Sequence, residues 1–325
     1  MPIIANSTFS SPRFLFNGHL QTIIPYLLRK VEPVNYRRER IFSPDDDFID
    51  LDWSEIGSDR LVIISHGLEG DTNRKYMKGM VKKVNEAGFD ALAWNCRGCS
   101  GELNKQIKSY HMGATEDLNL VISQIILKKK YKKIHLIGFS LGGNLVLKYL
   151  GEKGSSLPKE IDKAVAFSVP CDLLSTSIQF EAYGNYFYLK KFLKTMKEKI
   201  RKKHEREPHS LNIEGLKSIK NFRQFDEIFT APLHGFESAN DYYEKCSSLK
   251  SIPFISIPTL IINAQNDPFL TKACFPIQEA QNSKSVFLEM PVHGGHVGFL
   301  SKEKNIYWSE ERAIHFILHS EILPS

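Results

Sequence analysis

The sequence predicts an α/β fold in which a mostly parallel central sheet carries helices on both faces. Short apolar runs rich in β-branched residues alternate along the chain with helical segments. Such alternation is typical of parallel sheets, whose strands are buried on both faces and therefore apolar throughout. The 325 residues suit one large domain with an insertion.

The predicted elements follow one another from an aromatic arm to a terminal helix. The arm covers residues 1–33, and its simplest interpretation is a segment packed on the core. Residues 34–53 alternate apolar and polar side chains around a Pro-Asp turn, which predicts an antiparallel hairpin. The predicted buried strands are 61–65, 89–94, 134–137, 164–169, 259–263 and 285–290. The predicted helices are 75–87, 117–128, a helix after residue 140, and 309–319.

The alternation stops between Pro170 and about Leu249. Within this stretch one helical face is apolar, with Leu189, Phe192, Leu193, Met196 and Ile200 at helical spacing. The other face carries seven lysines and an arginine. We therefore expect a core of residues 1–170 and 250–325, and a helical lid insertion over residues 171–249 above the strand ends.

One stretch carries the strongest chemical signal. Gly138, Ser140 and Gly142 follow a buried strand and precede a helix, in the Gly-x-Ser-x-Gly spacing of a nucleophile elbow. Glycines on both sides let strand and helix approach closely around a strained serine. Ser140 is the predicted nucleophile, and the alternative is a purely structural glycine turn.

A serine nucleophile needs a base, and the base needs an orienting acid. Asp267 and His296 follow the last two predicted strands, which gives the chain order Ser, Asp, His. His296 is favoured because Gly294 and Gly295 let its loop fold back over the sheet. His293 remains an alternative base and Asp172 an alternative acid, while Asp267 before Pro268 is also compatible with a simple turn. His66 and His111 are further histidines expected in loops near the pocket.

The amides of Leu68 and Leu141 are the predicted oxyanion hole. Leu141 opens the helix after the nucleophile, where the helix dipole favours negative charge. Leu68 lies in the loop after the first parallel strand, where His66-Gly67 could also be no more than a tight turn. In open parallel sheets the ligand crevice lies at these carboxyl ends.

Several segments in combination resemble the YheT-like esterases, a branch of the α/β-hydrolase superfamily. They are the elbow and residues 66–70, 97–101, 110–111, 231–236, 266–268 and 294–299. Residues 17–22 (Asn-Gly-His-Leu-Gln-Thr) are also similar to that branch. The resemblance implies an α/β-hydrolase fold with a Ser140, Asp267, His296 triad. It further implies cofactor-free hydrolysis of carboxylic esters, often with short or medium acyl chains.

We therefore expect a serine-dependent carboxylic ester hydrolase that acts on small-molecule esters through an acyl-enzyme intermediate. An acyltransferase or a thioesterase would use the same triad, and a non-catalytic binding protein on the same scaffold is a third possibility. The basic lid helix also suggests weak peripheral contact with anionic membranes, although lysines facing water are the simpler explanation. The sequence gives no oligomeric state.

Net charge, cysteine content and hydropathy exclude several other classes of protein. The net charge of +6 is mild, and no nucleic-acid-binding motif occurs, so no nucleic-acid partner is expected. The five cysteines are scattered and odd in number, which predicts reduced thiols and a cytoplasmic location. The Cys96-x-x-Cys99 pair and the His293-x-x-His296 pair lack further ligands, so no metal is expected. No apolar run approaches the ~18 residues of a membrane span, and the N-terminus lacks the pattern of a signal peptide.

Overall fold

The computed structural model describes residues 2–303 and 307–319, and its centre is a nine-stranded sheet within those ranges. The strands are β1 (Ile3–Ile4), β2 (Arg37–Phe42), β3 (Phe48–Ser54), β4 (Arg60–Ser65), β5 (Asp90–Asn95), β6 (Lys133–Phe139), β7 (Ile161–Phe167), β8 (Thr259–Ile262) and β9 (Val286–Glu289). Their order is β1-β9-β8-β7-β6-β4-β5-β3-β2. The pairs β2–β3 and β3–β5 are antiparallel and the other pairs are parallel, so the sheet is mostly parallel, as predicted.

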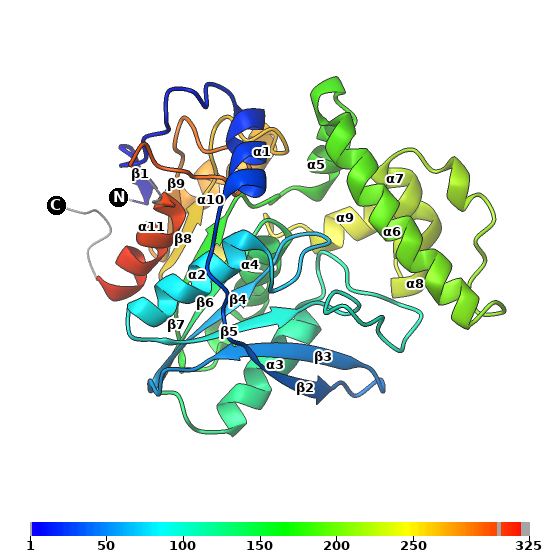
Figure 1. The fold of residues 1–325 in the computed structure, drawn as a ribbon, viewed down its shortest axis with the longest axis horizontal. Helices are drawn as coiled ribbons and strands as arrows, with labels where there is room; N and C mark the ends of the chain where they lie inside the picture. The colour runs from blue at the N-terminus through cyan, green and yellow to red at the C-terminus, as the bar shows by residue number, and fades with distance from the viewer. Residues whose placement is uncertain (1, 304–306, 320–325) are drawn as a thin grey trace.

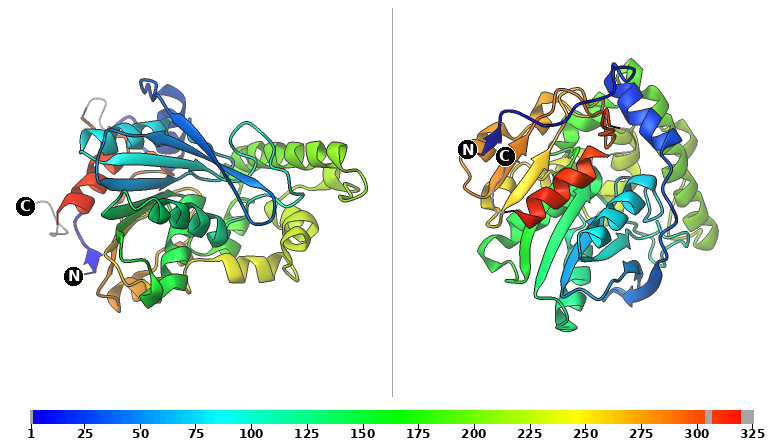
Figure 2. Two further views of the ribbon diagram at one scale, coloured as in Figure 1. Left: turned by 90° about the horizontal axis from the view of Figure 1, so that it is seen from below. Right: turned by 60° about the vertical axis from the view of Figure 1, so that its left-hand side comes forward.

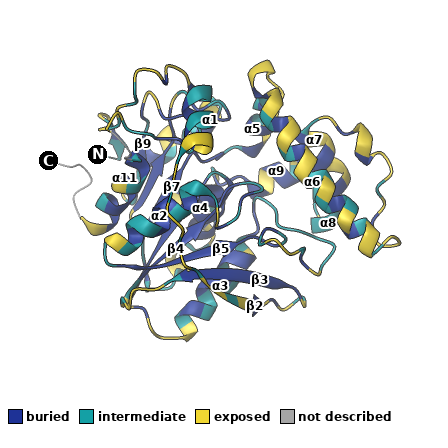
Figure 3. Cartoon of the chain, viewed as in Figure 1, coloured by how far each residue is buried: buried dark blue, intermediate teal, exposed yellow. Residues whose placement is uncertain are grey.

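Helices cover both faces of this sheet. Helices α2 (Lys75–Glu86) and α11 (Trp308–Leu318) pack side by side on one face. Helices α3 (Thr115–Leu127), α4 (Leu141–Lys153) and α10 (Ile277–Gln281) bury their apolar side chains against the other face. Strands β3 to β9 are largely buried between the two layers, whereas most of the edge strand β2 is exposed (Figure 3). This arrangement confirms the predicted fold class and explains why the strands read as continuous apolar runs.

The insertion over residues 171–249 consists of helices and connecting turns that gather at one end of the molecule (Figure 1). Its helices are α5 (Leu173–Gln179), α6 (Tyr186–Arg206), α7 (Phe222–Phe225), α8 (Ala231–His234) and α9 (Ala239–Cys246). The predicted apolar face of α6 packs against phenylalanines of α7 and of the π-helical turn Asp226–Thr230. The insertion therefore has apolar clusters of its own.

The N-terminal arm contains a short strand and a helix that the sequence did not predict. Ile3 and Ile4 pair in parallel with Leu288 and Glu289 of β9. Residues Gly18–Leu28 form helix α1, with Asn17 accepting a hydrogen bond at its N-terminus and Pro25 inside it. An interior proline and a short apolar sequence conceal this helix from periodicity analysis.

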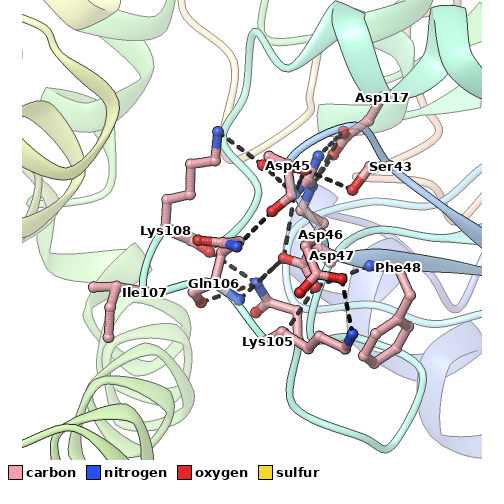
Figure 4. Close-up of polar contacts among 12 residues, drawn as sticks. Ser43, Asp45, Asp46, Asp47, Phe48, Lys105, Gln106, Ile107, Lys108 and Asp117 are labelled. Carbon is pink, nitrogen blue, oxygen red and sulfur yellow. Dashed lines mark hydrogen bonds and ion pairs between the residues drawn. The ribbon is translucent and has the colours of Figure 1, made fainter.

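A buried polar network joins the hairpin turn to the loop after β5. The Arg97 guanidinium donates to Asp117 at 2.8 Å, to Asp45 at 2.9 Å and to Asp47 at 3.2 Å. Asn104 donates to Asp47 at 2.6 Å. Figure 4 shows the three carboxylates converging, with the chain 105–108 running beside them. Because each carboxylate has donors, this loop is fixed at the base of the insertion.

Candidate active site

Ser140 lies on a sharp turn between β6 and α4. Its φ of 53° and ψ of −117° are strained for a side chain other than glycine. A Cβ added to Gly138 would lie 2.4 Å from the Gly142 carbonyl oxygen, and one added to Gly142 would lie 2.3 Å from that of Ser65. Both positions therefore require glycine, and the predicted elbow geometry is present.

The structure brings the three predicted triad side chains together. His296 Nε2 lies 2.9 Å from Ser140 Oγ, and His296 Nδ1 lies 2.8 Å from Asp267 Oδ2. Because the Asp267 carboxylate accepts the Nδ1 proton, Nε2 is free to accept from the serine hydroxyl. The Asp267 side chain is fully buried and its other oxygen accepts from the Phe269 amide at 2.9 Å. The arrangement can therefore transfer a proton from the serine to the imidazole.

The two predicted oxyanion donors lie beside the serine. Leu141 is the first residue of α4, so its amide has no partner within the helix. A Cβ added to Gly67 would lie 3.3 Å from Ser140 Cβ, which places the Leu68 loop against the nucleophile. Leu68 and Leu141 both line the cavity described below. Two amides at this position could stabilise negative charge that develops on a bound carbonyl oxygen.

Comparison with known proteins identifies the family. The family model for the alpha/beta hydrolase fold matches residues 60–303. The Escherichia coli (strain K12) protein named "Putative esterase YheT" is 36% identical over 91% of this chain and 89% of its own length. The chain belongs to the YheT-like branch of the α/β-hydrolases.

Other α/β-hydrolases show a weaker likeness to this one. A monoacylglycerol lipase of Saccharomyces cerevisiae is 30% identical over 88% of this chain and 64% of its own length. The solved structure of the Pyrococcus furiosus esterase Pf2001 superposes with a TM-score of 0.60 and 20% identity, covering 96% of this chain and 98% of that one. That structural likeness supports the fold.

The alternative catalytic residues have other contacts in this hydrolase. Asp172 accepts from the Ser175 amide at 2.8 Å and so caps helix α5. His293 Nδ1 lies 3.3 Å from the Asn266 side-chain amide. His111 Nδ1 lies 3.6 Å from Cys246 Sγ, on the insertion side of the cavity. These contacts favour His296 and Asp267 as the partners of the serine.

His66 holds the oxyanion loop in place. It is fully buried, and its Nδ1–H donates to the Gly67 carbonyl at 2.8 Å while its Nε2 accepts from the Cys96 amide at 3.1 Å. Burial lowers the pKa of His66 to about 4, so the ring is neutral near pH 7. A neutral ring with one donor and one acceptor satisfies both contacts. Its contribution is therefore structural.

Helix α1 connects the loops that carry the acid and the base. Gln21 Oε1 accepts from the Gly294 amide at 2.6 Å and from Asn266 Nδ2 at 2.9 Å. Thr22 Oγ1 accepts from the His296 amide at 2.8 Å. A Cβ on Gly18 would lie only 1.9 Å from the Asn266 carbonyl oxygen, so α1 sits directly on the acid loop. The Asn-Gly-His-Leu-Gln-Thr segment thus supports the site, a contribution that sequence analysis missed.

Two further neighbours of the base were also missed. The ring of Phe269 lies 4.4 Å, centroid to centroid, from that of His296. Ser168 Oγ accepts from the Val297 amide at 2.9 Å, next to the base. Ser168, Ser140 and Val297 all have positive φ, so strained backbone concentrates around the site. Phe269 follows the predicted strand 259–263, which was the available signal, whereas Ser168 fell within the predicted strand 164–169 and gave none.

A cavity extends from the oxyanion loop into the insertion. Its internal volume is about 100 Å³. Apolar residues dominate its insertion side, namely Phe180, Met196, Ile200, Phe222, Phe225, Phe229 and Leu233. Asp226 also lines it, and burial raises the pKa of this carboxyl to about 6 although Thr230 and Tyr243 donate to it. The predominantly apolar lining suits an apolar group of a small molecule.

The expectation of a fully solvated basic face on α6 is wrong at two positions. Lys203 is buried and donates to the carbonyls of Gln106 and Ile107 at 2.8 Å and of Lys108 at 3.0 Å. Lys199 Nζ donates to Glu69 Oε1 at 2.9 Å. These acceptors come from distant parts of the chain, so helical spacing could not reveal them. Both lysines fasten the insertion to the core near the site.

The described residues contain no helix long and apolar enough to cross a bilayer. Nor do those residues contain a cluster of three or more side chains suited to hold a metal ion. The five cysteines are free and buried. Cys96 and Cys99 stand at the two ends of a turn, where the Cys99 amide donates to the Cys96 carbonyl at 2.9 Å.

Proposed function

We propose that this α/β-hydrolase is a carboxylic ester hydrolase that uses Ser140 as nucleophile, His296 as base and Asp267 as the orienting acid. The observation that supports the proposal most is the unbroken hydrogen-bond chain from Ser140 through His296 to Asp267, at 2.9 and 2.8 Å. Similarity to an esterase and to a monoacylglycerol lipase supports the reaction class.

The proposed reaction has two halves. Ser140 Oγ attacks the ester carbonyl carbon while His296 Nε2 takes the hydroxyl proton. The amides of Leu68 and Leu141 hold the oxyanion, and His296 then gives its proton to the departing alcohol. Water, activated by the same imidazole, attacks the acyl-enzyme and releases the acid. Asp267 keeps the imidazole in the correct tautomer throughout.

We assign the cavity to the acyl chain of the substrate and residues 171–249 to a lid over it. The cavity begins at Leu68 and Leu141, where the carbonyl would lie, and continues between apolar side chains of the insertion. This continuity favours short- to medium-chain acyl groups. The free cysteines fit the predicted cytoplasmic location.

The test is hydrolysis of p-nitrophenyl esters of increasing acyl length by the full chain and by Ser140→Ala. We expect the variant to lose kcat by a factor on the order of 10⁶, as in other serine triads. The matched control is Ser210→Ala, which removes an exposed hydroxyl outside both the triad and the cavity lining. Undiminished hydrolysis by Ser140→Ala would refute the mechanism.

Product analysis separates the related reactions. With a p-nitrophenyl ester and added alcohol, a hydrolase releases mainly the free acid, whereas an acyltransferase forms mainly the new ester. Comparison with matched thioesters distinguishes a thioesterase. A fluorophosphonate probe that leaves Ser140 unlabelled would indicate a non-catalytic binding protein.

A further inference from the structure

Exposed apolar side chains concentrate in two segments that flank the N-terminal half of α6. Among the described residues, eighteen large apolar side chains are exposed, and ten of them lie within residues 14–28 and 174–187. The apolar rim is defined here by its six most protruding members: Phe14, Phe16 and Leu28 in the first segment, and Tyr183, Tyr186 and Phe187 in the second. Tyr183 is 100% exposed and Phe16 is 74% exposed. Such a concentration on a folded chain marks a surface that meets something apolar.

The two segments form one continuous surface. His19 Nδ1 lies 3.3 Å from the Tyr188 hydroxyl, and the two rings stack with centroids 5.9 Å apart. One helical turn away, Lys191 Nζ donates to the Tyr26 hydroxyl at 3.0 Å. Figure 1 and the right-hand view of Figure 2 both show α1 beside the start of α6. The two segments that carry the rim therefore adjoin one another.

The exposed charges around the rim are positive on balance. The exposed charged side chains of residues 11–30 and 173–194 are Arg13, Lys30, Lys190, Lys191, Lys194 and one acid, Glu181. Arg29 is not among them because it is buried in an ion pair with Glu310. With the exposed Glu32 and Glu198 just beyond these ranges included, five exposed cations face three anions, and this net positive charge favours a negatively charged partner.

We propose that the apolar rim docks this protein on the surface of an anionic lipid bilayer. Protruding aromatic and aliphatic side chains can enter the boundary between headgroups and acyl chains, while lysines and arginines at their margin contact anionic headgroups. The aromatic side chains of the rim suit the apolar boundary region, and the cations around them suit the anionic headgroups above it. The surface differs from the one expected from sequence, because two lysines of α6 face the core and the rim residues lie mainly outside that helix.

Docking in this way brings the triad close to the bilayer. The Tyr188 ring beside the rim lies 4.7 Å from the Phe269 ring, which in turn lies 4.4 Å from the His296 ring. The rim is thus separated from the candidate base by two aromatic side chains. Access to esters within the bilayer rests on the proposed function, whereas docking itself does not.

The test is co-sedimentation of the full chain with vesicles, comparing phosphatidylglycerol and phosphatidylcholine in equal parts with phosphatidylcholine alone. We expect binding to the anionic vesicles, and a loss of at least about tenfold in apparent partition constant for the double variant Phe16→Ser, Tyr183→Ser, because two apolar contacts are removed. The matched control is Phe254→Ser, Leu127→Ser, which removes exposed apolar side chains outside the two rim segments. It should bind within about twofold of the unchanged protein.

A charge variant tests the headgroup preference separately. Lys190→Glu, Lys194→Glu should abolish the advantage of anionic over neutral vesicles. Hydrolysis of soluble p-nitrophenyl acetate, measured for every variant, should remain unchanged, so a docking failure is distinguishable from a failure of the hydrolase assignment. The proposal is overturned if the unchanged protein ignores anionic vesicles or if the control variant loses binding equally. It is also overturned if light scattering shows that the rim substitutions dissociate a dimer without affecting vesicle binding.

Discussion

Replacing Gln21 by methionine tests whether α1 positions the acid and the base. Gln21 is 2% exposed, and its carbonyl oxygen accepts from Gly294 and Asn266. Its amide nitrogen donates to the Leu15 carbonyl at 2.6 Å and to Ser11 Oγ at 3.2 Å. Methionine has a similar length but makes none of these four hydrogen bonds, so the change removes the polar contacts while largely preserving volume.

The expected magnitude follows from the groups left without partners. The Gly294 amide and the Leu15 carbonyl would both remain buried without partners, at about 1–3 kcal/mol each, so the free energy of unfolding should fall by about 2–6 kcal/mol. The loops carrying Asp267 and His296 would lose their common support. Because misplacement by ~1 Å can cost ~10²-fold in rate, we expect kcat to fall by about 10- to 100-fold. KM should change by less than about threefold, since Gln21 does not line the cavity.

The assay is steady-state hydrolysis of p-nitrophenyl butyrate well below the unfolding midpoint, with thermal unfolding followed by circular dichroism. Gln278→Met is the matched control, because Gln278 is exposed on α10 and the same substitution there disturbs no contact with the triad loops. We expect the control to match the unchanged protein. If Gln21→Met lowers the unfolding midpoint but keeps kcat within about twofold, α1 stabilises the fold without positioning the site.

Three further predictions concern buried charge. Burial lowers the pKa values of His66 and His135 to about 4, so the folded state binds fewer protons than the unfolded state between about pH 6.5 and pH 4. Stability should therefore fall as the pH drops through that window, by up to about 3 kcal/mol for each ring, and flat urea-unfolding midpoints from pH 7 to pH 4.5 would contradict this. For Asp226 the pH dependence of stability has the opposite sign, because burial raises its pKa to about 6. Asp226→Asn should therefore increase the free energy of unfolding by about 2–3 kcal/mol at pH 7, and this gain should vanish below about pH 4. A gain independent of pH would exclude this cause. Arg97→Met leaves three carboxylates without their shared donor and should cost about 3–5 kcal/mol in urea unfolding, whereas a loss below about 1 kcal/mol would mean that the network relaxes freely.

Local motifs predicted the parts of this protein that depend on local geometry. Ser140 was found because its turn requires glycines at fixed spacing, and Asp267 and His296 because parallel strands end at a common edge. The fold class followed from the alternation of apolar strands and helices, which the sheet order confirms.

The features that sequence analysis missed depend on distant partners. The polar side chains of α1 form hydrogen bonds with loops more than 240 residues away along the chain, so their contribution cannot be predicted locally. Pro25 also conceals the helix that carries them. Lys199 and Lys203 were placed in water because helical spacing cannot show that Glu69 and the carbonyls of residues 106–108 lie opposite. A two-residue strand such as β1 is too short to give any periodic signal.

The closure of α1 onto the base loop has a consequence for protein synthesis. Thr22 and His296 are 274 positions apart, so their contact cannot form until residue 296 has left the ribosome. A nascent chain that already exposes Ser140 and Asp267 would contain Thr22 but would still lack the His296 imidazole and its contact with α1. The proposed ester cleavage should therefore begin only once residue 296 has emerged, and removal of the first 22 residues should abolish it although Ser140, Asp267 and His296 are all intact.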